Sequence, residues 1–116
     1  MALNFGHTIG HSIEILSDYG IKHGAAVAAG CCIILRAEAE EKMLDRATAE
    51  DTEKLLESLG LPTNTDYPAE ELAKAAGADK KNTSDVSRLV LLRKPGEPFV
   101  RNFTVPELVA FISKGI

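Results

Sequence analysis

The apolar stretch at residues 25–35 constrains the fold of this 116-residue chain most strongly. It carries no charged side chain, and its residues are small or aliphatic. A helix formed there would be apolar almost all round and would offer no face suited to water. The stretch is too short to cross a bilayer, which needs about 20 apolar residues. We therefore expect a central core helix that begins just after His23-Gly24 and continues to about residue 44, with its charged second half, 36–42, emerging into solvent.

Two adjacent cysteines, Cys31 and Cys32, lie in this apolar stretch. Successive side chains of a helix point about 100° apart, which disfavours a disulfide between neighbours. No further cysteine or histidine stands at ligand spacing for a zinc site with them. We expect both to be buried thiols in a reducing cytoplasm, where they contribute to packing.

Local signals predict four further helices and one β-hairpin, and no linker or repeat separates them. The fold class is therefore mainly α, a single multi-helix domain over residues 1–116 with one short hairpin. Asn4 is the expected N-cap of a first helix that ends near residue 17, and Thr48 with Asp51 forms a capping box for a helix that Gly60 ends. Residues 66–68 and Gly77 bound a fourth helix, and Thr104 with Glu107 caps the last one. Between these two helices, β-like runs at 88–92 and 99–103 flank a turn at 95–98. Two of these helices carry predicted inward stripes: Leu55, Leu56 and Leu59 in the third, and Leu108, Val109, Phe111 and Ile112 in the last.

Composition excludes several classes of function. The net charge is −4 and no cluster of Lys or Arg follows a helix face, so nothing indicates nucleic-acid binding. Aromatic residues make up only 5% of the chain, which also disfavours a base-stacking surface. No basic segment precedes an apolar one at the start, so we expect no secretory signal and no membrane attachment.

The histidines carry the strongest functional signal. His7 and His11 stand four residues apart and share one helix face, and His23 follows twelve residues later. Two imidazoles four apart can share a zinc ion, although this spacing alone is also common among exposed helix histidines. Gly6 and Gly10 flank the pair although each costs a helix about 1 kcal/mol, and they would let another backbone or a ligand approach closely.

Glu14 falls on the same helix face as His7, seven residues on. Three roles are open to it: a metal ligand, a partner that orients an imidazole, or a solvated helix charge.

A family resemblance extends over essentially the whole chain. The matching residues are Asn4-Phe5-Gly6-His7-Thr8-Ile9-Gly10-His11-Ser12-Ile13-Glu14, His23-Gly24, Gly60-Leu61-Pro62, Asp79-Lys80-Lys81-Asn82 and Val90-Leu91-Leu92 with Gly96. Together they resemble the C-terminal, helical half of 3-dehydroquinate synthase. Metal-dependent alcohol dehydrogenases share the histidine spacing, but the segment before His7 and the element at 79–81 favour the synthase.

The resemblance implies a reaction of the shikimate route to aromatic amino acids. The family converts 3-deoxy-D-arabino-heptulosonate 7-phosphate, a phosphorylated sugar acid, to 3-dehydroquinate and phosphate, as a carbon–oxygen lyase. Bound NAD⁺ transiently oxidises a ring hydroxyl, phosphate is eliminated, the ketone is reduced, and the ring opens and recloses by an aldol step. Zinc, or cobalt in its place, polarises the hydroxyl.

The resemblance also implies roles for particular residues. His7 and His23 would be metal ligands, and His11 an acid/base group near the substrate. Asn4 would contact the substrate, and a lysine of Lys80-Lys81 would bind its phosphonate or carboxylate end.

This sequence departs from the family in two ways. Ala25 follows His23-Gly24 where the family usually has glutamate, which removes a carboxylate beside the site. The family's N-terminal domain, with its NAD site, its third zinc ligand and several basic residues, has no counterpart here, and no G-x-G-x-x-G segment appears. We therefore expect weak zinc binding, no activity from the chain alone, and self-association through a face that includes Ala25, Ala26, Val27 and Ala29.

Two alternative functions remain open if the resemblance reflects a shared fold and not a shared reaction. One is a related sugar-phosphate cyclase or a metal-dependent alcohol or glycerol dehydrogenase. The other is a non-catalytic helical module in which the histidines are structural.

Overall fold

A computed structural model of the chain describes residues 6–78, 86–94 and 97–116. Its elements follow in the order α1 (His7–Leu16), α2 (His23–Glu40), α3 (Arg46–Ser58), α4 (Ala69–Ala78), β1 (Val86–Lys94), β2 (Glu97–Thr104) and α5 (Val105–Ser113). The two strands pair antiparallel as a hairpin. The predicted mainly helical fold with one β-hairpin is confirmed. None of the helices in the described ranges is both long and apolar enough to cross a membrane.

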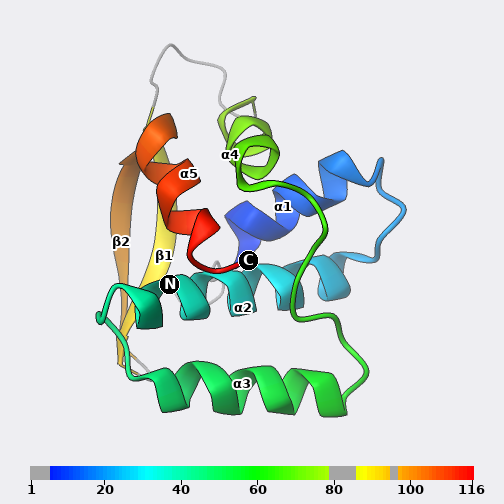
Figure 1. The fold of residues 1–116 in the computed structure, drawn as a ribbon. Helices are drawn as coiled ribbons and strands as arrows, with labels where there is room; N and C mark the ends of the chain where they lie inside the picture. Colours follow the sequence, from blue (N-terminus) through cyan, green and yellow to red (C-terminus); the bar gives the residue numbers. More distant parts are fainter. Residues whose placement is uncertain (1–5, 79–85, 95–96) are drawn as a thin grey trace.

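Helix α2 occupies the centre of the molecule, as its sequence predicts. Figure 1 shows α3 on one side of it, α1 and α5 on the other, and the hairpin beside its C-terminal end. Ala26, Ala29, Ile33 and Ile34 of α2 are fully or almost fully buried. The main core surrounds them with buried residues from every other element except α3: Ile9, Ile13, Ala69, Leu72, Ala73, Ala76, Leu89, Leu91, Phe103, Leu108, Phe111 and Ile112.

The second half of α2 does not emerge into solvent as expected. Ala37, Glu38 and Ala39 are all buried, because the hairpin packs beside this end of the helix. Glu38 is 0% exposed, and its Oε1 accepts a hydrogen bond from the backbone N–H of Leu92 in β1 at 3.0 Å. The helix also ends earlier than predicted, at Glu40, because Lys42 turns the chain with a φ of 63°.

Arg36 is likewise drawn into the fold. Its Nε donates to the carbonyl of Gly115 at 2.6 Å, and its Nη2 donates to that of Thr63 at 2.7 Å. Its Nη1 lies 3.3 Å from Glu53 Oε1 in α3. One guanidinium thus joins α2 to the C-terminal residues, to the connection before α4 and to α3.

Helix α3 buries a different face from the one predicted. Of the expected stripe, Leu55 is 59% exposed and Leu59 is 65% exposed, and Leu56 alone is half-buried. The face toward α2 instead carries Ala49, which is buried, and Glu53, which pairs with Arg36. The helix is capped by Asp45, whose side chain accepts from Ala47 N, and not by Thr48.

The predicted start of α1 and the predicted end of α4 differ from the structure, whereas the predicted start of α5 agrees with it. Helix α1 begins at His7 with Gly6 at its N-cap, so Asn4 is not the cap, and Gly77 lies inside α4 instead of ending it. The capping box of α5 is confirmed: Thr104 Oγ1 accepts from Glu107 N, and Glu107 Oε1 accepts from Thr104 N. Of its predicted inward residues, Leu108, Phe111 and Ile112 are buried, and Val109 is half-buried.

Glu38 makes the stability of the fold dependent on pH. Burial raises its pKa from 4.5 to about 7, Glu41 adds to the rise, and the Leu92 hydrogen bond and Arg101 oppose it. Between these two values the folded state holds a proton that the unfolded state has lost. The free energy of unfolding should therefore fall as pH rises through this window, by up to about 3 kcal/mol.

The substitution Glu38→Gln keeps an oxygen for Leu92 N–H and should remove this part of the pH dependence. Urea denaturation between pH 4.5 and 7 measures the difference between the two proteins. Glu50→Gln, on the exposed surface of α3, is the matched control and should keep the original slope. An unchanged slope in Glu38→Gln would contradict the assignment.

Candidate functional site

The site is built on a close crossing of α1 and α2. A Cβ placed at Gly30 would lie 2.5 Å from the carbonyl oxygen of Gly6 and 2.8 Å from the backbone nitrogen of Gly10. A Cβ at Gly10 would lie 3.0 Å from Val27 Cα. The two helix backbones are therefore in direct contact, which only glycine permits. Of the two approaches expected at Gly6 and Gly10, the structure shows that of another backbone, and that backbone belongs to α2.

The crossing brings two histidines from different helices together. The ring centroids of His7, at the start of α1, and His23, at the start of α2, are 5.4 Å apart with their planes inclined by 52°. His7 Nδ1 is buried, and no hydrogen-bond partner for it lies in the described part of the chain. The side chain of His23 is 63% exposed.

Glu14 links this pair to the third histidine. Its Oε2 lies 3.1 Å from Nδ1 of His23, and its Oε1 lies 3.5 Å from Nδ1 of His11. The Glu14 side chain is only 12% exposed, and that of His11 is 39% exposed. Glu14 is therefore not a solvated helix charge, because each carboxylate oxygen faces an imidazole.

The arrangement of His7 and His23 fits two ligands of one metal ion. With Zn–N bonds of about 2.0–2.1 Å and tetrahedral angles, two imidazoles on one zinc have ring centroids about 5 Å apart. The observed separation of 5.4 Å agrees with this geometry. Within the described ranges, no three His, Cys, Asp or Glu side chains form a group that could hold a metal ion by themselves. These residues thus offer two ligands, and a complete site needs more.

Comparison with known proteins places the chain in a family. Residues 1–82 match the family model for the 3-dehydroquinate synthase C-terminal region. A 3-dehydroquinate synthase of Dehalococcoides mccartyi is 37% identical over 114 residues, which are 97% of this chain and 32% of that protein. One of Clostridium perfringens is 41% identical over 107 residues, 90% of this chain and 31% of the relative. This chain belongs to the 3-dehydroquinate synthase family. It spans about a third of the length of the curated relatives it matches.

A solved structure shows the same fold. It is a 2-deoxy-scyllo-inosose synthase complexed with carbaglucose-6-phosphate, NAD⁺ and Co²⁺. The likeness covers 97% of this chain and 33% of that one, with a TM-score of 0.75 and 22% sequence identity.

Three of the predicted site residues, Asn4, Lys80 and Lys81, lie outside the described residues. The other three, His7, His11 and His23, are brought to one place with Glu14. The predicted self-association face is only partly available, because Ala26 and Ala29 are buried against the rest of the chain. Ala25 and Val27 are half-buried.

The adjacent cysteines form no disulfide, as expected. Cys32 is buried and Cys31 half-buried, and burial raises the pKa of each thiol to about 11. Both are therefore protonated at neutral pH and are poor nucleophiles and poor metal ligands. Their role is packing beside the crossing, where Cys31 Sγ lies next to Gly6.

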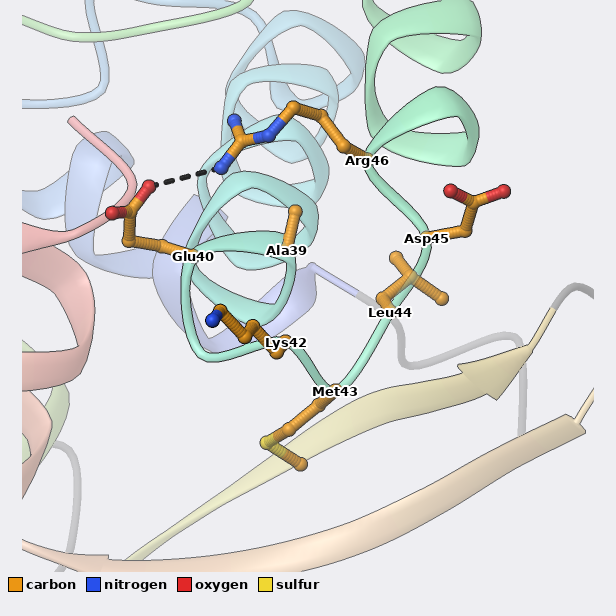
Figure 2. Close-up of a pocket in the computed structure, with 7 residues that line it drawn as sticks. All are labelled: Ala39, Glu40, Lys42, Met43, Leu44, Asp45 and Arg46. Atoms are coloured by element: carbon orange, nitrogen blue, oxygen red, sulfur yellow. Dashed lines mark hydrogen bonds and ion pairs between the residues drawn. The ribbon is translucent and has the colours of Figure 1, made fainter.

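A surface pocket of about 480 Å³ lies away from the histidines, at the turn between α2 and α3. Figure 2 shows it lined by Ala39, Glu40, Lys42, Met43, Leu44, Asp45 and Arg46. Glu40 and Arg46 form an ion pair of 3.1 Å there. None of the predicted site residues lines this pocket.

The helix crossing can be tested by adding a single methyl group. Gly30→Ala should destabilise the fold by about 1–3 kcal/mol, because its Cβ would meet the backbone of α1. Gly24→Ala, at the start of the same helix, has nothing within 4 Å of its Cβ and is the matched control. Thermal unfolding compares the two proteins. Equal stability of both variants would contradict backbone contact at the crossing.

Proposed function

We propose that this chain supplies the metal-binding and substrate-binding part of a 3-dehydroquinate synthase. The reaction converts 3-deoxy-D-arabino-heptulosonate 7-phosphate to 3-dehydroquinate and phosphate. The observation that carries the proposal is the His7–His23 pair, which the α1–α2 crossing holds at a ring separation compatible with two ligands of one ion. Relatives named 3-dehydroquinate synthase, 37% to 42% identical to this chain, support the choice over a cyclase with another product or a dehydrogenase.

In this proposal His7 and His23 hold zinc or cobalt. When bound, the metal would act as a Lewis acid toward a substrate hydroxyl. The neighbouring Glu14 carboxylate supplies the negative charge that Ala25 does not, because it contacts His23 directly. The 2-deoxy-scyllo-inosose synthase of the same fold is complexed with Co²⁺ and NAD⁺, which is consistent with a metal and NAD in this family.

His11 is the proposed acid/base group of the site. It stands one helical turn from His7, its side chain is partly exposed, and an imidazole can both accept and donate a proton near neutral pH. Asn4 and a lysine of Lys80-Lys81 would bind the substrate, with the lysine at its phosphonate or carboxylate end. These roles rest on the match to the family motif.

The remaining parts of the active site are proposed to come from a partner region. The relatives are about three times as long as the matched segment, and the family model is that of a C-terminal region. We propose that an N-terminal NAD-binding domain provides the third metal ligand and the nicotinamide. A reducing cytoplasm, where the cysteines stay as thiols, would suit this enzyme.

Metal titration separates the roles of the three histidines. We expect the chain to bind zinc weakly in calorimetric titrations, because its described residues supply two ligands and catalytic sites use three from protein. His7→Ala and His23→Ala should abolish binding, whereas His11→Ala should retain it. Tight binding that survives His7→Ala would contradict the ligand assignment, and loss in His11→Ala would make His11 a ligand.

Turnover tests the reaction itself. The chain alone should form no 3-dehydroquinate with NAD⁺, zinc and substrate, because holding a hydride acceptor in position can contribute about 7–11 kcal/mol. Addition of an N-terminal domain from a relative should restore activity. In that pair, His11→Ala should lower the rate about 10²–10⁴-fold while zinc stays bound. Turnover by the chain alone, or turnover only of another sugar phosphate, would contradict the proposal.

A further inference from the structure

Glu14 lies between the histidines and is not itself one of the two proposed metal ligands. Its Oε2 is at hydrogen-bond distance, 3.1 Å, from Nδ1 of His23, and its Oε1 is 3.5 Å from Nδ1 of His11. The carboxylate comes from the last turns of α1, and His23 is the first residue of α2. One side chain therefore touches an imidazole of each helix.

The backbone of Glu14 also takes part in the turn that connects α1 to α2. Tyr19 N donates to the backbone carbonyl of Glu14 at 2.7 Å, which closes the end of α1. Asp18 and Tyr19 both adopt the left-handed region, with φ values of 54° and 60°. Such conformations are unfavourable in residues other than glycine and persist only where the surroundings enforce them. The tight turn returns the chain so that His23 reaches the Glu14 carboxylate.

Hydrogen-bond chemistry then decides which nitrogen of His23 carries the proton. An ionised carboxylate only accepts hydrogen bonds. The neutral imidazole of His23 must therefore donate from Nδ1, which leaves the lone pair on Nε2. A metal binds the nitrogen that has the lone pair, and a carboxylate on the opposite nitrogen both fixes the ring and raises its basicity.

We propose that Glu14 is a positioning residue that holds His23 in its Nδ1-protonated tautomer, so that Nε2 is the metal-binding nitrogen. Its other oxygen lies 3.5 Å from Nδ1 of His11 and so faces the proposed acid/base group as well. This inference rests on the proposed metal role of His23, and its tautomer part stands independently of it.

The test measures tautomers and metal affinity separately. ¹⁵N NMR of the metal-free 116-residue chain at about pH 8 distinguishes the Nδ1–H tautomer from the Nε2–H tautomer of each histidine. We expect His23 to be Nδ1–H in the unsubstituted chain and to lose that preference in Glu14→Ala. Zinc affinity should fall about 10–100-fold in Glu14→Ala, the usual effect of removing such a partner. Glu50→Ala, an exposed carboxylate of α3, should change neither quantity.

Glu14→Gln provides a second variant of nearly the same shape. Its amide offers one acceptor and one donor in place of two acceptors. His23 should therefore lose its strict preference for the Nδ1–H tautomer while the chain stays folded, a change that a merely structural role would not produce. Circular dichroism confirms that each variant is folded.

The outcomes separate this inference from the proposed function. An Nε2–H tautomer of His23 in the unsubstituted chain, or tautomers unchanged in both Glu14 variants, overturns the role of Glu14 even if His7 and His23 bind zinc. Absence of zinc binding overturns the metal site, whereas Glu14-dependent tautomers would still support the positioning role.

Discussion

Direct backbone contact between α1 and α2 is the constraint on which the site depends. Gly6, Gly10 and Gly30 allow the two helices to meet without intervening side chains. The contact fixes the relative position of the first residues of both helices, and these are His7 and His23. Glycine in a helix is locally unfavourable, and here this cost is offset by the burial of Ile9, Ile13, Ile33 and Ile34 around the crossing. The same helix crossing thus determines both the packing of the core and the relative position of the two histidines.

Polar side chains fix further parts of the site and of the fold. The Glu14 carboxylate lies largely out of solvent between two imidazoles, where hydrogen bonds to it are stronger than in water. Two other polar side chains of the fold, Arg36 and Glu38, hold the outer elements to α2 through backbone groups of Thr63, Gly115 and Leu92.

The sequence predicts those features that depend on neighbouring residues. The apolar stretch at 25–35 predicts the central helix, and Thr104 with Glu107 predicts the start of α5. It does not predict the burial of Glu38, because that burial depends on a hairpin 54 residues further on. Leu55 and Leu59 suggest an inward stripe, but α3 turns Ala49 and Glu53 toward α2. There Ala49 joins a buried cluster with Leu35, Ala39 and Leu44, and Glu53 pairs with Arg36. For the site, spacing along the chain identifies the histidines, whereas the contact of Glu14 with His23 depends on the turn at Asp18 and Tyr19.

The central claim is that the helix crossing brings His7 and His23 onto one metal ion. X-ray absorption spectroscopy of the zinc-loaded chain counts the imidazoles bound to the metal. Our account predicts two imidazoles per zinc, the same number in His11→Ala, and no bound zinc in a chain that lacks either His7 or His23. Three imidazoles, or two that persist when His7 is replaced, would contradict it.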